Sequence, residues 1–318
     1  MKYSRVLLCI SAAALFCTAF ASAQSGTAQS QGQAILTILP KGGEFGTLTP
    51  ANLRIKVDGK PALVTALTPL RGPANPIELV ILIDSGARTS LGGQLGELTH
   101  FVQETPSDTK IALAYMQNGQ AVLATPLTSD PAQAERGIHI PIGSAGSSAS
   151  PYFCLSDLAR NWPSSDPRAR REVLMITDGI DAYNRRFDPN DPYVQTAIAD
   201  ALHARLVVHS IYWTSRGNAD DTAAASNTGQ SLLSIVSAAT GGVSYWQGAG
   251  NPISFDSYFV DLRHRLRNQY LLTVSVSQSG KSAGKTVIAS LDLKGTGLST
   301  KIDAPQEILL RPLDLPAK

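Results

Sequence analysis

The sequence has few charged residues and no large excess of either charge sign. Charged residues make up 16% of the chain, whereas about 25% is typical of globular domains, and apolar residues make up 43%. This composition argues against long disordered regions and coiled coils. The 27 basic residues nearly balance the 25 acidic residues, which excludes a strongly basic nucleic-acid binder.

Catalytic and metal motifs built on histidine or cysteine are also absent. The five histidines form no HExxH motif, and His209 lies within an apolar strand pattern, where a packed residue is expected. Cys154 lies on an apolar helix face and is expected to be inert. Residues 280–284 read G-x-S-x-G but lack the helix that must follow a nucleophile elbow. The sequence therefore predicts a protein that is not an enzyme.

The first 23 residues are typical of a secretory signal peptide. Lys2 and Arg5 precede an apolar run at 6–20, and residues 21–23 (ASA) form a small-residue cleavage pattern. The alternative is a membrane anchor, although the run is short for a span of about 20 residues. Cleavage removes two of the 27 basic residues and two of the three cysteines, so no intramolecular disulfide is expected. We expect a periplasmic or secreted protein without a stable membrane span after cleavage.

The two ends of the chain are rich in short β-like runs. Neither the N-terminal set at 34–67 nor the C-terminal set at 270–303 has enough strands for independent stability, so the two sets are predicted to share one β module. The predicted organisation, in chain order, is a signal peptide at 1–23, a disordered leader at 24–33, an N-terminal β segment at 34–76, an α/β domain at 77–250, and a C-terminal helix and β segment at 251–318.

The central part of the chain alternates buried strands with helical patterns. Continuous apolar runs at 78–84, 172–177 and 206–213 indicate parallel strands that are covered on both faces, and a further strand at 110–116 is expected in the same sheet. The predicted fold class is therefore α/β, with a doubly wound, mostly parallel sheet and a smaller β module from the terminal segments. On the helix at 255–269, a run of three arginines is predicted to be a solvated face or, alternatively, a basic patch for anionic partners: Arg263, Arg265 and Arg267.

Two acidic residues follow buried strands of this sheet. Asp84 ends the run LVILID, and Asp178 follows the run VLMIT. Ligands of open α/β sheets bind outside the carboxyl ends of strands, so both carboxylates are expected at one crevice. Carboxylates with nearby hydroxyls are ligands that suit Mg²⁺. Ordinary cap or turn chemistry at strand ends is the alternative.

The strand ending in Asp84, the strand ending in Thr177-Asp178-Gly179 and the elements between them resemble a von Willebrand factor type A (VWFA) domain. The segment 262–276 (LRHRLRNQYLLTVSV) resembles the VWFA-related branch typical of acidobacterial secreted proteins. The resemblance covers roughly residues 77–276. It implies a metal-ion-dependent adhesion site that holds Mg²⁺ or Mn²⁺ and leaves one position open for an acidic side chain of a partner protein.

The adhesion motif is degenerate in this chain. The pattern D-x-S-x-S reads DSGAR at 84–88, so Gly86 and Arg88 replace both serines, and Ser148 or Ser150 would stand in for a threonine of the family. By this resemblance, the metal ligands would be Asp84, Ser85, Ser148 and Asp178. No cofactor is the expectation, and Mg²⁺ or Mn²⁺ is the alternative.

Arg88 leaves three alternatives open. Its guanidinium can pair with the two carboxylates in place of a cation, it can swing away and leave room for a metal, or it can face solvent or a partner. A second acidic cluster at 181–191 is expected to be a turn in which Asp191 caps the next helix, with Ca²⁺ binding as the alternative. The residues predicted to contact a partner are Arg88, Thr89, Ser90, Thr177, Gly179 and Asp181.

The sequence as a whole predicts an exported recognition module that binds a protein partner and not nucleic acid. The alternatives are a structural scaffold of an envelope assembly, without a ligand at the degenerate site, and a hydrolase that uses the crevice between Asp84 and Asp178.

Overall fold

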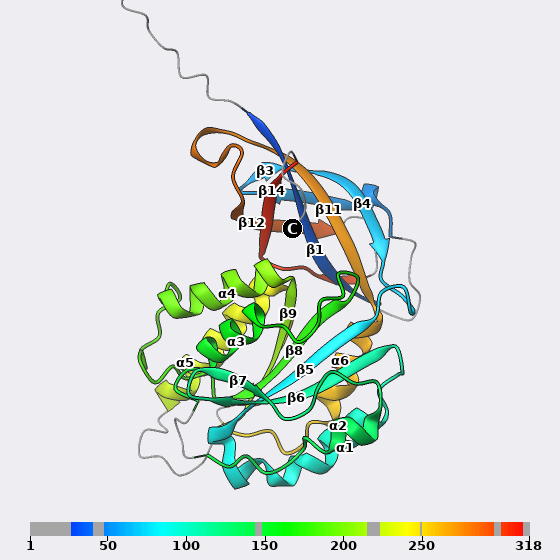
Figure 1. The fold of residues 1–318 in the computed structure, drawn as a ribbon. Coiled ribbons are helices and arrows are strands. Elements are labelled where there is room, and N and C mark those ends of the chain that lie inside the picture. The colour runs from blue at the N-terminus through cyan, green and yellow to red at the C-terminus, as the bar shows by residue number, and fades with distance from the viewer. Residues whose placement is uncertain are drawn as a thin grey trace, which may run out of the picture.

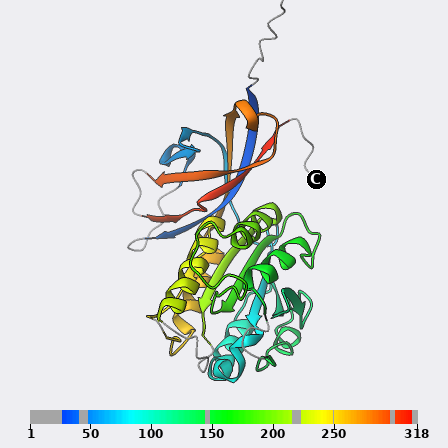
Figure 2. The same ribbon diagram turned by 90° about the vertical axis from the view of Figure 1, so that its left-hand side faces the viewer.

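Two β-sheets organise the chain in the computed structural model of the protein (Figure 1). The structure describes residues 27–40, 48–143, 148–214, 223–248, 250–295 and 300–313, without the side chains of residues 88, 89 and 223. The predicted signal peptide lies outside these residues. Figure 2 shows the strands of one sheet gathered at one end of the molecule and the helices gathered around the other sheet.

The larger sheet has eight strands and is built from both ends of the chain. In spatial order it comprises β3 (Lys60–Pro61), β2 (Leu53–Val57), β12 (Val287–Gly295), β14 (Glu307–Pro312), β1 (Ala28–Pro40), β11 (Gln269–Gln278) and β4 (Leu63–Pro69), with β13 (Thr300–Asp303) paired to β1. All of these pairings are antiparallel. In β2, buried and exposed residues alternate, so one face of the sheet carries an apolar core of its own.

The second sheet has six strands and comes from the middle of the chain. Its order is β10 (Ser244–Tyr245), β9 (Leu206–Tyr212), β8 (Arg170–Thr177), β5 (Ile77–Asp84), β6 (Thr109–Gln117) and β7 (Gln120–Leu123). Neighbours from β10 to β6 pair in parallel, and β7 runs antiparallel to β6. Asn118 and Gly119 have φ of 50° and 77°, the left-handed conformation that a tight hairpin turn requires.

Helices cover both faces of this sheet, so every residue of β5 is buried. One apolar cluster joins alternate residues of β5 to α1 (Leu95–Gln103), α2 (Pro131–Glu135) and α6 (Asp256–Arg267). A second cluster joins the other residues of β5 to α3 (Pro151–Arg160), α4 (Pro192–Ala204) and α5 (Ala223–Thr240). Three 3-10 helices complete the described elements: η1 (Pro50–Asn52), η2 (Ser85–Gln94) and η3 (Gly280–Ser282).

The predicted fold class is wrong. The chain is not a doubly wound parallel sheet with a small β appendage, because its larger sheet is the curved, antiparallel, eight-stranded one and the six-stranded sheet is mixed. The terminal segments supply more strand than predicted. Residues 28–33, predicted as disordered leader, belong to β1, and 307–312 form β14.

Polar pairing explains why β1 begins earlier than its apolar pattern suggests. Ser30 is fully buried and its hydroxyl donates to Gln278 Oε1 at 2.6 Å, while Gln29 Nε2 donates to Ser277 Oγ at 2.8 Å. The same register joins Ala28 to Gln278 across the sheet. The prediction that both ends of the chain share one β module is confirmed by these pairings, as is the parallel pairing of β5, β8 and β9.

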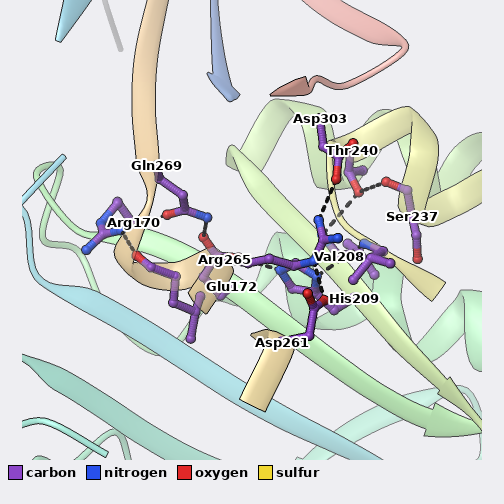
Figure 3. A network of polar contacts seen from close by, with 12 residues as sticks. Arg170, Glu172, Val208, His209, Ser237, Thr240, Asp261, Arg265, Gln269 and Asp303 are labelled. Carbon is purple, nitrogen blue, oxygen red and sulfur yellow. Dashed lines mark hydrogen bonds and ion pairs between the residues drawn. The ribbon is translucent and has the colours of Figure 1, made fainter. Parts of the chain in front are cut away.

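A buried polar network lies where the two sheets meet (Figure 3). Gln269, the first residue of β11, donates through Nε2 to Glu172 Oε1 at 2.8 Å and accepts from Arg170 Nη1 at 2.7 Å. His209 Nδ1 accepts from the Val243 N–H, so the ring proton lies on Nε2 and points to Glu172 Oε2 at 3.1 Å. His209 is therefore a packed structural residue, as predicted.

The C-terminal arginine run is only partly a solvated face. Arg265 is buried, and its guanidinium contacts Asp261 at 2.6 Å and Asp303 at 2.7 Å. The prediction is wrong for this residue, because β13 places Asp303 above the helix. Among the described residues, no helix is long and apolar enough to cross a membrane.

Candidate functional site

Asp84 lies at the carboxyl end of β5, where three segments meet. Its Oδ1 accepts from the Gly86 N–H at 2.8 Å, and its Oδ2 accepts from Thr177 Oγ1 at 2.7 Å and from Ser148 Oγ at 3.4 Å. The carboxylate is buried, and burial raises its pKa, although these hydrogen bonds act in the opposite direction. The structure thus brings together Asp84, Ser148 and Thr177 from the predicted site.

The segment that carries Ser148 is fixed by its backbone. The Ser148 carbonyl accepts from the N–H groups of Gly119 and Ser150, both at 2.8 Å. Ala149 has φ of 63°, which is costly for a residue with a Cβ, and its carbonyl accepts from the Ala182 N–H at 3.1 Å. This contact ties the segment before α3 to the segment after β8.

The segment after β8 turns at Gly179, which has φ of 69°. A Cβ at this position would lie 2.6 Å from Leu233 Cγ and 2.7 Å from the Gly229 carbonyl oxygen, so only glycine fits. Asp178 Oδ1 accepts from the Ile180 N–H at 2.9 Å. The turn that follows Asp178 is therefore packed against α5.

Three buried oxygens lie at this edge, and the Ser150 hydroxyl is close enough to Asp181 to lower the pKa of its carboxyl group. The three oxygens are Ser85 Oγ, Ser150 Oγ and Asp181 Oδ2. Asp181 Oδ1 accepts from the Tyr183 N–H at 2.8 Å, and burial raises the pKa of this carboxyl group. Buried polar atoms without partners are rare, and the Ser85 hydroxyl is one of them at this edge.

Whether the degenerate motif holds a metal ion stays a prediction. Gly86 carries no side-chain oxygen, and the Ser148 hydroxyl is directed to the Asp84 carboxylate. Nor do the described residues contain a group of three or more His, Cys, Asp or Glu side chains placed to hold a metal ion. The predicted turn at 181–191 is confirmed for Asp191, which caps α4 by accepting from the N–H groups of Tyr193 and Val194.

Of the predicted partner contacts, three are buried and Ser90 is exposed. Thr177, Gly179 and Asp181 are buried, so they support the edge without offering surface to a partner. Ser90 donates to the Ala87 carbonyl at 2.6 Å and accepts from Trp213 Nε1 at 3.0 Å. The side chains of Arg88 and Thr89 lie outside what the structure describes.

Cys154 is no candidate nucleophile. It is completely buried, its Sγ contacts the Ser148 carbonyl at 3.6 Å, and burial with the nearby Asp84 raises its thiol pKa to about 12. The thiolate form, which is the nucleophile, is therefore negligible near neutral pH. This outcome confirms the prediction of an inert cysteine.

An exposed aromatic patch, which the sequence analysis missed, adjoins the Asp84 cluster. It consists of Phe153, Tyr183 and Tyr193: the ring of Phe153 lies 5.4 Å from that of Tyr183 and 4.8 Å from that of Tyr193. Tyr183 is 68% exposed and Tyr193 is 43% exposed. The available signal was the presence of aromatic residues within a polar segment, DAYNRRFDPNDPY, at 181–193.

Comparison with known proteins gives weak structural similarities. No family model matches, and no curated protein matches. Among solved structures, BatB from Bacteroides thetaiotaomicron is 15% identical, covers 60% of this chain and 97% of its own, and has a TM-score of 0.42. An aerotolerance-related membrane protein from Bacteroides fragilis is 16% identical, with coverage of 60% and 98% and a TM-score of 0.40.

A third similar structure is the vWF domain of the type V pili tip protein Mfa5 from Porphyromonas gingivalis. It is 11% identical, with coverage of 61% of this chain and 95% of its own, and a TM-score of 0.41. This structure is of the domain type that the sequence of this chain resembles. At TM-scores below 0.5 these similarities carry no argument about function, and membership of the acidobacterial branch stays a prediction.

Proposed function

We propose that this chain is an exported, non-enzymatic recognition module that binds a partner protein through the carboxyl edge of its six-stranded sheet. The observation that carries the proposal is the aromatic patch of Phe153, Tyr183 and Tyr193 beside the buried Asp84 cluster. Tyrosine and phenylalanine are enriched at protein interfaces, where their rings bury a large area at a low entropic cost.

The patch is held in place by the residues beneath it. The Tyr183 N–H donates to Asp181, the Tyr193 N–H donates to Asp191, and Ala182 is bonded to Ala149. A surface whose backbone is fixed before binding loses less entropy when the partner arrives. The buried acids therefore serve as supports, and recognition needs no metal ion.

Export is part of the proposal and rests on the sequence alone. The basic residues Lys2 and Arg5, the apolar run and the ASA pattern at 21–23 support a periplasmic or extracellular location.

The scaffold alternative has one observation in its favour. Thr177, Gly179 and Asp181 are buried, so these three residues offer no surface to a ligand. A hydrolase lacks such support, since Cys154 is inert and the described serines at this edge contact no histidine.

The test is a capture experiment with matched variants. The immobilised chain is exposed to envelope extract, and the retained proteins are compared with those retained by Tyr183→Ser/Tyr193→Ser and by Leu63→Ser. Leu63 lies on β4 and is 69% exposed, which matches Tyr183, but it belongs to the other sheet. Loss of a retained protein with the double variant alone supports recognition through the edge. Equal retention by all three forms contradicts it.

A further inference from the structure

A second site lies at the opposite edge of the six-stranded sheet, where the eight-stranded sheet meets it. A cavity of about 310 Å³, called here the junction pocket, opens at the first residues of β5, β6 and β8. Its apolar wall includes Leu70, Ile77, Phe101 and Leu266. Because these strands begin here and β5 ends at Asp84, the junction pocket is separate from the recognition edge.

Four guanidinium groups line the junction pocket, those of Arg71, Arg170, Arg263 and Arg267. One carboxylate, that of Asp108, lines it as well. The net charge of the lining is therefore strongly positive. A whole-chain charge of only +2 makes this local excess notable for a protein that otherwise balances its charges.

Arg170 is the most informative of the four. Its side chain is 5% exposed, and its donors reach only neutral oxygens: Nη1 contacts the Leu266 carbonyl and Gln269 Oε1, both at 2.7 Å, and Nε contacts the Asn75 carbonyl at 3.2 Å. Nη2 donates to no residue that the structure describes. The nearest carboxylate in the network is Glu172, one Gln269 amide away (Figure 3).

A buried guanidinium without a carboxylate partner is unusual. Buried charges are normally paired, because leaving water costs several kcal/mol per ion. Burial lowers the pKa of Arg170, Glu172 and Asp108 raise it, and the neighbouring Arg71 lowers it again. A bound anion near Arg170 would therefore lower the electrostatic cost of burying this guanidinium.

The other three arginines differ in how many hydrogen bonds, ion pairs and ring contacts they already make. Arg71 donates to the carbonyls of Leu70 and Gln269 at 3.0 and 2.8 Å and lies over the Tyr270 ring. Arg263 pairs with Glu104 and lies over the Phe101 ring. Arg267 is exposed and has no ion pair or hydrogen bond with the described residues. Arg267 is therefore available to a ligand at the mouth of the cavity.

We propose that the junction pocket binds a small anionic amphiphile, a molecule with one carboxylate or phosphate group on a short apolar body. The anionic group lies between Arg170 and Arg267, since planar guanidinium groups bind carboxylate and phosphate oxygens in pairs. The apolar body lies against Leu70, Phe101 and Leu266. The volume is at the lower end of the range for small-molecule sites, which limits the body to a short chain or a single ring.

The proposal is tested by calorimetric titration of the full chain with octanoate and octyl phosphate below their micellar concentrations. Inorganic phosphate and octylammonium are the reference probes, because the first lacks the apolar body and the second reverses the charge. We expect one of the two anionic octyl compounds to bind with a stoichiometry of one, at least tenfold more tightly than either reference probe. The stronger of the two identifies the headgroup class.

Matched variants locate the binding. Arg267→Gln should weaken binding at least fivefold, and its exposed position leaves the fold intact. Arg54→Gln removes another exposed arginine, from β2, and should change nothing. The proposal is overturned if neither anion binds at millimolar concentration, if octylammonium binds as tightly as the anions, or if the Arg267 and Arg54 variants bind alike.

Discussion

Thr177 and Asp84 are 93 residues apart in the chain, and the Thr177 hydroxyl donates a 2.7 Å hydrogen bond to Asp84 Oδ2. The contact exists because β5 and β8 pair in parallel with Ile83 opposite Ile176, so that their carboxyl ends coincide. The same hydroxyl accepts from the Gly179 N–H at 3.2 Å. One threonine thus joins the acid of one strand to the turn after the other.

Replacing this hydroxyl by a methyl group should destabilise the protein. Thr177→Val keeps the shape but leaves Asp84 Oδ2 and the Gly179 N–H without a partner in a buried site, which costs about 1–3 kcal/mol in the free energy of unfolding. Urea unfolding measures the change. The matched control is Thr65→Val, whose hydroxyl makes a single 3.2 Å bond to the Thr273 carbonyl near the surface. A Thr177 variant no less stable than the control would show that this contact contributes nothing.

The turn at Gly179 should tolerate no side chain. Gly179→Ala combines a left-handed φ of 69° with contacts of 2.6 and 2.7 Å, whereas Gly280→Ala has the same φ and no heavy atom within 4 Å of the added Cβ. Both variants carry the left-handed penalty of roughly 1–2 kcal/mol, and Gly179→Ala adds steric overlap. Thermal unfolding should therefore rank Gly179→Ala clearly below Gly280→Ala. Equal melting temperatures would contradict the closed turn.

The buried Asp84 carboxyl group predicts a specific pH dependence. Its pKa in the folded state is raised by burial, so the folded state binds the proton more tightly than the unfolded chain does. The stabilisation from this group is complete below pH about 4 and is lost as the pH rises through the folded-state pKa. Asp84→Asn lacks this titration, so its stability relative to the unsubstituted protein should increase between pH 4 and pH 7.

Urea unfolding of both forms at several pH values measures this difference, and the comparison cancels the other titrating groups. A relative stability of Asp84→Asn that falls with rising pH would mean that the hydrogen bonds from Gly86, Thr177 and Ser148 outweigh burial.

The degenerate motif predicts weak or no binding of Mg²⁺. Arg88 stands where the adhesion motif has a ligand serine, and two unit charges of the same sign at ~4 Å repel by roughly 4 kcal/mol at an effective dielectric constant of about 20. Gly86→Ser/Arg88→Ser should create or strengthen binding, measured by calorimetric titration with Mg²⁺ and Mn²⁺. Tight binding by the unsubstituted protein that disappears in Asp84→Ala would show that the site functions without its serines.

Local patterns predicted the features that depend only on residues next to one another in the sequence. Continuous apolar runs identified β5, β8 and β9, and the Asp191-Pro192 pair identified the start of α4. The fold class failed because β1 is polar over its first six residues, and its pairing depends on partners near residue 278. The β-strand period of two is masked because the buried positions in this part of β1 carry serine and glycine.

In the candidate site, too, the sequence predicted local features but not the contacts between distant segments. The placement of Asp84 at a strand end followed from the apolar run before it, and its contacts with Ser148 and Thr177 depend on how strands pair. The burial of Asp181 could not be predicted, since the segment that carries it is joined to a distant segment through the hydrogen bond from Ala182 to Ala149. The aromatic patch brings residue 153 together with residues 183 and 193, which no local pattern connects.

Site-specific photo-crosslinking tests the central claim, recognition through the carboxyl edge, most directly. A photoreactive phenylalanine analogue is placed at Tyr183 or at Leu63 in cells that express the chain, and these two positions are equally exposed. We predict one discrete crosslinked protein from position 183, lost when Tyr193→Ser is added, and none from position 63. Crosslinks of equal strength from both positions, or from position 63 alone, would contradict the recognition edge and favour the scaffold alternative.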